Sequence, residues 1–303
     1  MIEVRDLTKR YGATTAVDSL SFTVHPGRVT GFLGPNGAGK STTLRMILGL
    51  HAPTSGSVTV SGRPFGELPR GLRHVGALLD AADVHGGRTA RAHLGILARS
   101  NRIPRARVEE LLEEVGLAGA ARRRIGGFSL GMRQRLGIAA ALLGDPPVLL
   151  FDEPLNGLDP EGVKWLRGLF RRLAAQGRTV FVSSHLMSEM EHTADDLVVV
   201  GRGSLIAAES LSAFAARGTR ASVTVGTPSA AALSALLLAE GAAVEPEEGG
   251  LLTVTGLSAA RIGDIALDHR LPLHQLTTRT ASLEEAFMEL TADSVEYLAG
   301  EAR

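Results

Sequence analysis

A glycine-rich run that ends in lysine and serine is the clearest chemical pattern in this sequence. Gly34-Pro-Asn-Gly-Ala-Gly-Lys-Ser41 fits G-x-x-x-x-G-K-[ST] and lies between a predicted strand, Val29–Leu33, and a predicted helix over residues 42–50. The glycines of such a loop let the backbone wrap closely around phosphates, and its N–H groups point inward as donors. The positive end of the following helix dipole adds to this attraction. The run therefore predicts a phosphate cradle for a nucleoside triphosphate.

Each part of the cradle has an expected role. Lys40 should reach the β- and γ-phosphates, and the Ser41 hydroxyl should bind magnesium. The other predicted nucleotide-binding residues share their position in this loop or directly after it: Gly34, Pro35, Asn36, Gly37, Ala38, Gly39 and Thr42.

Two adjacent acids and a histidine follow other predicted strands. Asp152 and Glu153 come directly after the apolar run 148–151, and His185 follows the run 179–182. Ligands of parallel sheets bind at the carboxyl ends of the strands, so these residues are expected at one edge. Asp152 is predicted to hold magnesium, because a buried acid is costly without a cation. Glu153 is predicted to act as general base on the attacking water, and His185 to contact the γ-phosphate.

Further motifs resemble those of the ABC family of ATPases. Phe128-Ser-Leu-Gly-Met-Arg-Gln-Arg135 is similar to the signature that usually reads LSGGQ-x-Q-R. Asn156-Gly-Leu-Asp159 resembles the D-loop of the family, and Tyr11 resembles the aromatic residue that stacks on adenine. The motifs occur in the family's order over residues 1–217. The resemblance implies an ATPase that uses ATP and Mg²⁺.

The signature begins at the predicted start of a helix. Ser129 is a good N-cap for a helix running to about Leu143, and such a helix end attracts anions. The resemblance implies that Ser129, Gly131 and Asp159 contact nucleotide, with the signature facing the γ-phosphate held by an opposing subunit. A head-to-tail dimer with a second ATP-binding subunit, expected to be a homodimer, follows from it.

Three departures from the usual motifs help to place the chain within the family. Leu130 replaces the usual first glycine of the signature, and Met132 replaces glutamine. Asp80 stands where the Q-loop normally has glutamine, and we expect it to serve as a magnesium ligand with a shorter reach and an added charge. Together with the tail over residues 282–291, these features resemble the drug and antibiotic exporter branch, which includes peptide-antibiotic self-resistance pumps.

The elements that must position these residues indicate two domains. Strands alternating with helices over residues 1–217 predict a parallel sheet covered on both faces. The resemblance to the ABC family implies an α/β P-loop NTPase of the ABC type, with a mixed sheet, helices on both faces and a helical subdomain over about residues 80–145. Short strands and helices that alternate over residues 220–303 predict a small α+β accessory domain.

Composition limits the remaining function classes. The 303 residues include 32 Lys and Arg, 32 Asp and Glu and no cysteine, so neither nucleic-acid binding nor a thiolate metal site is expected. No stretch approaches the ~18 consecutive apolar residues of a membrane span, and the start lacks a secretory signal. We expect a cytoplasmic protein held at the inner face of the membrane by a separate permease, which should dock on residues 80–99.

Two alternatives remain open. One is an ABC ATPase that acts on nucleic acid or ribosomes, although such proteins usually carry tandem cassettes, a coiled-coil insertion or a zinc module. The other is an importer subunit, against which Asp80 and the tail argue. A regulatory module that binds ATP without turnover is disfavoured by the presence of both Glu153 and His185.

Overall fold

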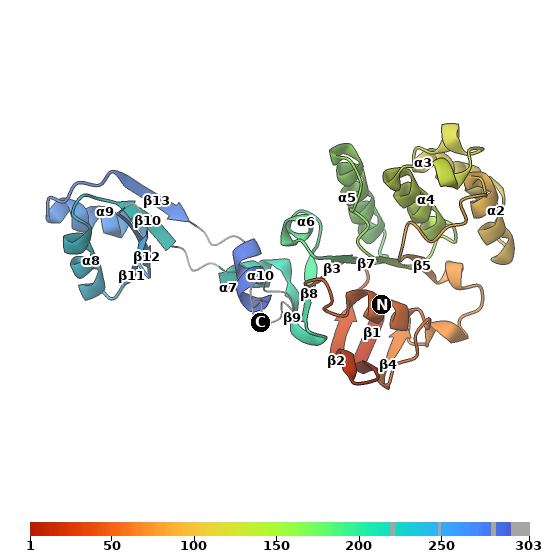
Figure 1. The fold of residues 1–303 in the computed structure, drawn as a ribbon, viewed down its shortest axis with the longest axis horizontal. Helices are drawn as coiled ribbons and strands as arrows, with labels where there is room; N and C mark the ends of the chain where they lie inside the picture. The colour runs from red at the N-terminus through yellow and green to blue at the C-terminus, as the bar shows by residue number, and fades with distance from the viewer. Residues whose placement is uncertain (219–221, 248–249, 280–282, 292–303) are drawn as a thin grey trace, which may run out of the picture. The chain divides into compact units, whose positions relative to one another are not determined.

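The computed structural model describes residues 1–218, 222–247, 250–279 and 283–291 (Figure 1). The chain forms two compact units, of which the first contains Met1–Leu211 and takes in the last described residues, Leu290 and Thr291. The second unit is Ser212–Glu289. The predicted boundary at residues 217–220 falls partly on positions outside the described ones, as does Ser282 at the start of the tail.

The core of the first unit is a six-stranded sheet in the order β5-β6-β7-β3-β8-β9. Neighbouring strands run parallel except for β9, which pairs antiparallel with β8, so the predicted mixed sheet is confirmed. Strands β3, β6 and β7 contain the three apolar runs named above, and a fourth apolar run, 197–200, lies in β8. Each of the four is buried on both faces, as expected for parallel strands. The bounds are β3 Val29–Leu33, β5 Val75–Leu78, β6 Val148–Phe151, β7 Thr179–Ser184, β8 Asp196–Gly201 and β9 Ser204–Ser210.

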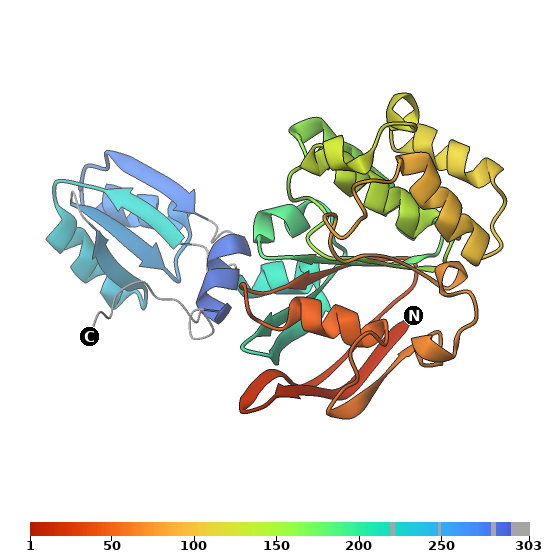
Figure 2. The same ribbon diagram turned by 45° about the vertical axis from the view of Figure 1, so that its right-hand side comes forward.

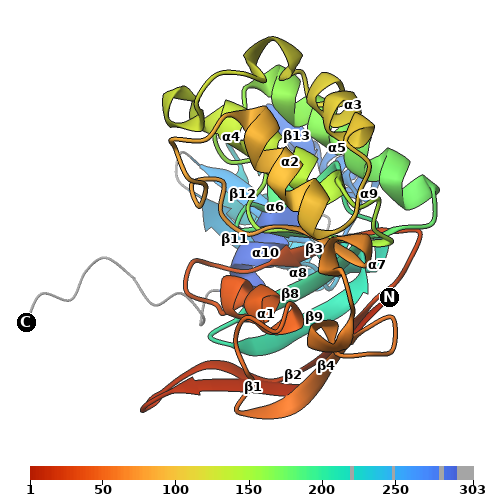
Figure 3. The same ribbon diagram turned by 90° about the vertical axis from the view of Figure 1, so that its right-hand side faces the viewer.

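A second, antiparallel sheet covers one face of this core. Its strand order is β2-β1-β4, with β1 Ile2–Tyr11, β2 Thr14–Val24 and β4 Ser55–Val60. Helix α1 (Lys40–Ile47) lies between the two sheets (Figures 2 and 3). The rings of Phe22, Phe32 and Phe181 join them, with centroids 5.0 to 5.8 Å apart. This packing supports the start of α1, where the predicted cradle lies.

Helices cover the other face of the core sheet (Figure 1). Among them α2, α3 and α4 pack together within the span predicted as a helical subdomain. In the part of the chain that the structure describes, no helix combines the length and the apolar character that crossing a membrane requires. The bounds are α2 Ala90–Ser100, α3 Ala106–Glu114, α4 Leu130–Leu142, α5 Pro160–Ala175 and α6 Met187–Glu191.

The second unit has a four-stranded antiparallel sheet in the order β11-β12-β10-β13. Val223 pairs with Val254 and Val225 with Leu252, so these side chains share one face, and helices α8 and α9 pack on it. Strand β11 contains Pro246 and lies at the edge of the sheet, where a missing N–H is tolerated. The bounds are β10 Ser222–Gly226, α8 Ala230–Ala239, β11 Ala243–Glu247, β12 Leu251–Thr255, α9 Ala259–Asp268 and β13 Gln275–Arg279. Helices α7 (Leu211–Gly218) and α10 (Leu283–Thr291) each contain residues of both units.

Candidate nucleotide site

The cradle loop joins the end of β3 to the start of α1 and passes close to two other backbone segments. A side chain on Gly39 would bring its Cβ to 2.5 Å from the oxygen of Ala16, and Gly39 also has φ +93°. A Cβ on Gly34 would lie 2.4 Å from the oxygen of Val200. Only glycine fits at these two positions, so the loop takes its path because of the glycine spacing.

The loop encloses a cavity of about 230 Å³. Most of the predicted cradle residues line it, and Glu153 reaches it from the end of β6. The lining residues are Ala16, Asn36, Gly37, Ala38, Gly39, Lys40, Ser41, Thr42 and Glu153.

Lys40 is the buried cation of this cavity. Its Nζ donates to the backbone oxygens of Gly34 at 2.6 Å and Pro35 at 3.2 Å, and lies 3.7 Å from Oε1 of Glu153. Burial lowers the pKa of Lys40, while the carboxylates of Glu153 and Asp152 act in the opposite direction. A positive charge among several oxygens, at the start of a helix, suits the binding of phosphate.

Glu153 and His185 lie in contact at the same edge of the sheet. Oε2 of Glu153 is 2.9 Å from Nδ1 of His185, while Oε1 faces Lys40. Strands β6 and β7 are neighbours, which brings these residues together although they are 32 positions apart. The carboxylate therefore lies between the cation of the cradle and an imidazole.

Ser183 organises both acids and was not predicted. Its fully buried hydroxyl donates to Oδ1 of Asp152 at 2.5 Å and accepts from the backbone N–H of Glu153 at 2.9 Å. The register of the sheet pairs Phe151 with Val182, so the next residue of each strand is Asp152 and Ser183. The parallel pairing of the two predicted strands was the signal that could have identified Ser183.

The signature and the D-loop touch each other. Ser129 caps α4, its side chain accepting from the N–H of Met132 at 3.2 Å, as predicted for an N-cap. Leu130, 50% exposed, lies over Gly157, where an added Cβ would be 2.3 Å from Cδ2 of the leucine. Asp159 accepts from the N–H of Gly162 at 2.9 Å and so caps α5.

Two other predicted residues lie outside this cluster. Tyr11, at the end of β1, is 47% exposed, and its hydroxyl is 2.8 Å from Nδ1 of His51. Asp80 follows β5, and its Oδ1 accepts from the N–H of Ala82 at 2.7 Å. Within the described residues neither side chain hydrogen-bonds to the cradle.

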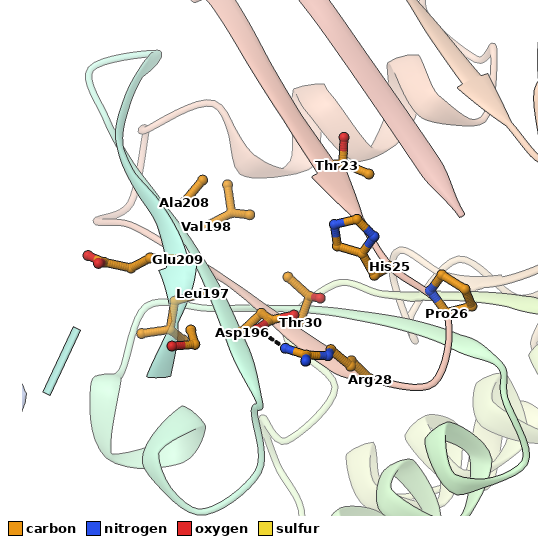
Figure 4. A pocket seen from close by; sticks show the side chains of 11 residues that line it. Thr23, His25, Pro26, Arg28, Thr30, Asp196, Leu197, Val198, Ala208 and Glu209 are labelled. Carbon is orange, nitrogen blue, oxygen red and sulfur yellow. Dashed lines mark hydrogen bonds and ion pairs between the residues drawn. The ribbon is translucent and has the colours of Figure 1, made fainter. Parts of the chain in front are cut away.

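A larger cavity, of about 730 Å³, lies at the end of the core strands opposite to the cradle. Figure 4 shows His25, Arg28, Thr30 and Asp196 around it, with Nη1 of Arg28 at 2.8 Å from Oδ1 of Asp196. It is open at the amino ends of β3 and β8, whereas ligands of parallel sheets bind at the carboxyl ends. The chemistry of the residues, and not the size of the cavity, makes the cradle the candidate nucleotide site.

Comparison with known proteins identifies the family. Residues 17–156 match a family model described as ABC transporter. The bacitracin transport ATP-binding protein BcrA of Bacillus licheniformis is 44% identical over 209 residues, which cover 68% of this chain and 68% of that protein. The chain belongs to the ABC transporter family. It is an ATP-binding subunit of that family and an ATPase.

Other matches extend the likeness along the chain. YhcH of Bacillus subtilis (strain 168), an uncharacterized ABC transporter ATP-binding protein, is 33% identical over 300 residues, 98% of this chain and 97% of YhcH. A solved ATP-binding subunit of an ABC transporter is 29% identical with a TM-score of 0.66, covering 72% of this chain and 92% of the other. Residues 221–284 match a family model described as a domain of unknown function, DUF8746.

Replacing Ser183 with alanine in this ABC ATPase is expected to lower turnover and stability together. The change removes the hydrogen bonds to Asp152 and to the N–H of Glu153, at a cost of about 1–3 kcal/mol in the free energy of unfolding. Urea denaturation and steady-state ATP hydrolysis measure the two effects. Ser188→Ala, at an exposed position of α6, is the matched control. Wild-type values for both quantities in Ser183→Ala would contradict the bridging role.

Proposed function

We propose that this ABC ATPase hydrolyses ATP at the cluster of Lys40, Glu153 and His185 and thereby drives a separate membrane permease. The observation that carries the proposal is the position of the Glu153 carboxylate, 3.7 Å from Nζ of Lys40 and 2.9 Å from Nδ1 of His185. Lys40 binds the β- and γ-phosphates, which holds the γ-phosphate at the cavity that Glu153 lines. Glu153 then accepts a proton from the attacking water, and His185 contacts the γ-phosphate.

Magnesium fits the residues at the same edge. Asp152 is 9% exposed, and among the described contacts its carboxylate is engaged through Oδ1 alone. Mg²⁺ in phosphate sites usually takes one or two carboxylates, phosphate oxygens and waters rather than a cage of protein ligands. We infer that Asp152 and Ser41 hold the ion, with Asp80 as a further ligand, and that it neutralises phosphate charge when bound.

The nucleotide site needs a second subunit in this proposal. Ser129, Gly131 and Asp159 do not line the cradle cavity of their own chain, which is the expected arrangement if they contact nucleotide held by a partner. Each chain has one cradle and one signature, so a head-to-tail homodimer would form two equivalent sites. Closure with ATP and opening after hydrolysis would supply the movement that the permease uses.

The name of a relative supports the proposed cargo, and one surface of the chain supports the proposed docking of the permease. The relative named for bacitracin transport supports an exporter of peptide or other antibiotics. Docking is proposed on the segment 80–99, where α2 borders a cavity of about 490 Å³ and Ile96 is exposed. The subunit would then work in the cytoplasm, at the inner face of the membrane.

Removing the metal tests the hydrolysis directly. We expect the purified chain to release phosphate from ATP in excess Mg²⁺ and to lose this activity when EDTA chelates the metal, because Asp152 and Ser41 act through that ion. Size-exclusion chromatography with ATP reports dimer formation in parallel. Turnover that is unaffected by EDTA would contradict the metal assignment. Ribosomes or nucleic acid that co-purify with the chain and stimulate its turnover would favour a role outside transport.

A further inference from the structure

A buried amide on the signature helix is not used by the site described above. Gln134 lies on α4 and is 5% exposed. Its side-chain nitrogen donates to the backbone oxygen of Asn156 at 3.2 Å and, at a longer 3.5 Å, to that of Glu153. Both acceptors belong to the loop that follows β6. The signature helix is therefore tied to the loop that carries the general base.

The neighbours of this amide determine its orientation. Carbonyl oxygens only accept hydrogen bonds, so the NH₂ group of Gln134 must face them and Oε1 must point elsewhere. Oε1 is buried and has no hydrogen-bond partner in the part of the chain that the structure describes. Burying an unpaired polar atom destabilises a protein, and a leucine of similar size would avoid that cost. The two donated hydrogen bonds are what a leucine could not provide.

The backbone of Glu153 depends on such support. Glu153 has φ +47°, in the left-handed region that residues other than glycine rarely adopt. A backbone in this region persists where surrounding contacts hold it. The N–H of Glu153 donates to Ser183, on β7, and its oxygen accepts from Gln134, on α4. The backbone of Glu153 is thus held on both sides, by a residue of β7 and by a residue of α4.

The helix that supplies Gln134 also carries the signature. Ser129 caps α4 five residues before Gln134, a distance of about 7.5 Å along the helix axis. Leu130 adds a contact with Gly157, in the same loop that Gln134 holds. A movement of the signature end of α4 would therefore be passed to Glu153 through a rigid element.

We propose that Gln134 is a positioning residue for Glu153 and links the signature of each subunit to the general base of the same subunit. It holds the Glu153 peptide so that the carboxylate stays between Lys40 and His185. The inference rests on the proposed ATP hydrolysis and deepens it. A signature engaged with the partner's nucleotide would fix α4, and α4 would fix Glu153, so that hydrolysis at one site would depend on occupancy of the other.

The test compares Gln134→Leu with Glu153→Gln and with the double variant. We expect Gln134→Leu to lower kcat by about 10- to 100-fold, as small displacements of catalytic groups do, with KM for ATP within about 2-fold of wild type. Adding Gln134→Leu to Glu153→Gln should lower the residual rate no further, because Gln134 acts through Glu153. Gln176→Leu, at the exposed end of α5, is the matched control.

Other outcomes would overturn the inference. A wild-type kcat in Gln134→Leu, or a raised KM with unchanged kcat, would remove Gln134 from this role. So would a further loss of rate in the double variant, or a fall in kcat that follows a lowered Tm. If the leucine variant fails to fold, Gln134→Glu, which replaces the donor with an oxygen that repels both carbonyls, gives the same comparison. Failure of the proposed function would appear separately: Glu153→Gln would then hydrolyse ATP at the wild-type rate.

Discussion

Replacing Glu153 with glutamine is expected to lower ATP turnover by at least about 100-fold, within the range that general-base catalysis contributes, and to leave ATP binding close to wild type. Glutamine has nearly the shape of glutamate and retains polar contacts with Lys40 and His185. It cannot accept a proton from water at neutral pH, so the chemical step fails while the cradle is preserved. The variant should then accumulate as an ATP-bound dimer, because opening follows hydrolysis.

Three measurements check this expectation. They are kcat in steady state, the Kd of ATP by calorimetry, and size-exclusion chromatography with ATP and Mg²⁺. Glu191→Gln, at an exposed position at the end of α6, controls for the loss of one negative charge. Normal turnover in Glu153→Gln would show that another group accepts the proton.

Replacing Lys40 with alanine should instead weaken the binding of ATP itself. Hydrogen bonds to charged groups contribute about 1.5–3 kcal/mol, so the Kd should rise by roughly 10- to 100-fold. In the structure Nζ of Lys40 already has two backbone oxygens and Glu153 around it, which holds the ammonium group at the cavity. Calorimetry with ATP and with ADP would separate the contribution of the γ-phosphate.

The controls for Lys40 test its geometry as well as its charge. Lys164→Ala removes an exposed lysine of α5 and should leave the Kd unchanged. Lys40→Arg keeps the charge but not the compact ammonium group, and we expect it to recover only part of the affinity. An unchanged Kd in Lys40→Ala would count against the cradle assignment.

The parallel core of the fold could be predicted because its strands are short apolar runs that differ from everything around them. Strands β3, β6, β7 and β8 are buried on both faces, and burial leaves a continuous hydrophobic signal. Strands β1 and β2 were missed, because one face of each is exposed and polar and the register between them shifts at several places. Such irregular alternation gives no clear period in the sequence.

The residues of the site also fall into those that the sequence predicts and those that it does not. Lys40, Glu153 and His185 come from motifs at strand ends, and the topology of the sheet brings them together. Ser183 and Gln134 are ordinary residues whose importance depends on which strand or loop lies opposite, and this is known only once elements are paired. Tyr11 and Asp80 lie apart from the cluster, and their predicted roles require a nucleotide or an ion to reach them.

The contact between Leu130 and Gly157 makes amino-acid changes at these two positions depend on each other during evolution. While leucine occupies position 130, a side chain at 157 would meet Cδ2 of the leucine at 2.3 Å. Position 157 also has φ +76°, which asparagine or aspartate tolerates better than other side chains do. A side chain there would require the half-exposed Leu130 to turn away, so the residues accepted at the two positions should depend on each other. Chimeric cassettes would meet the same dependence, so the two segments should be exchanged together.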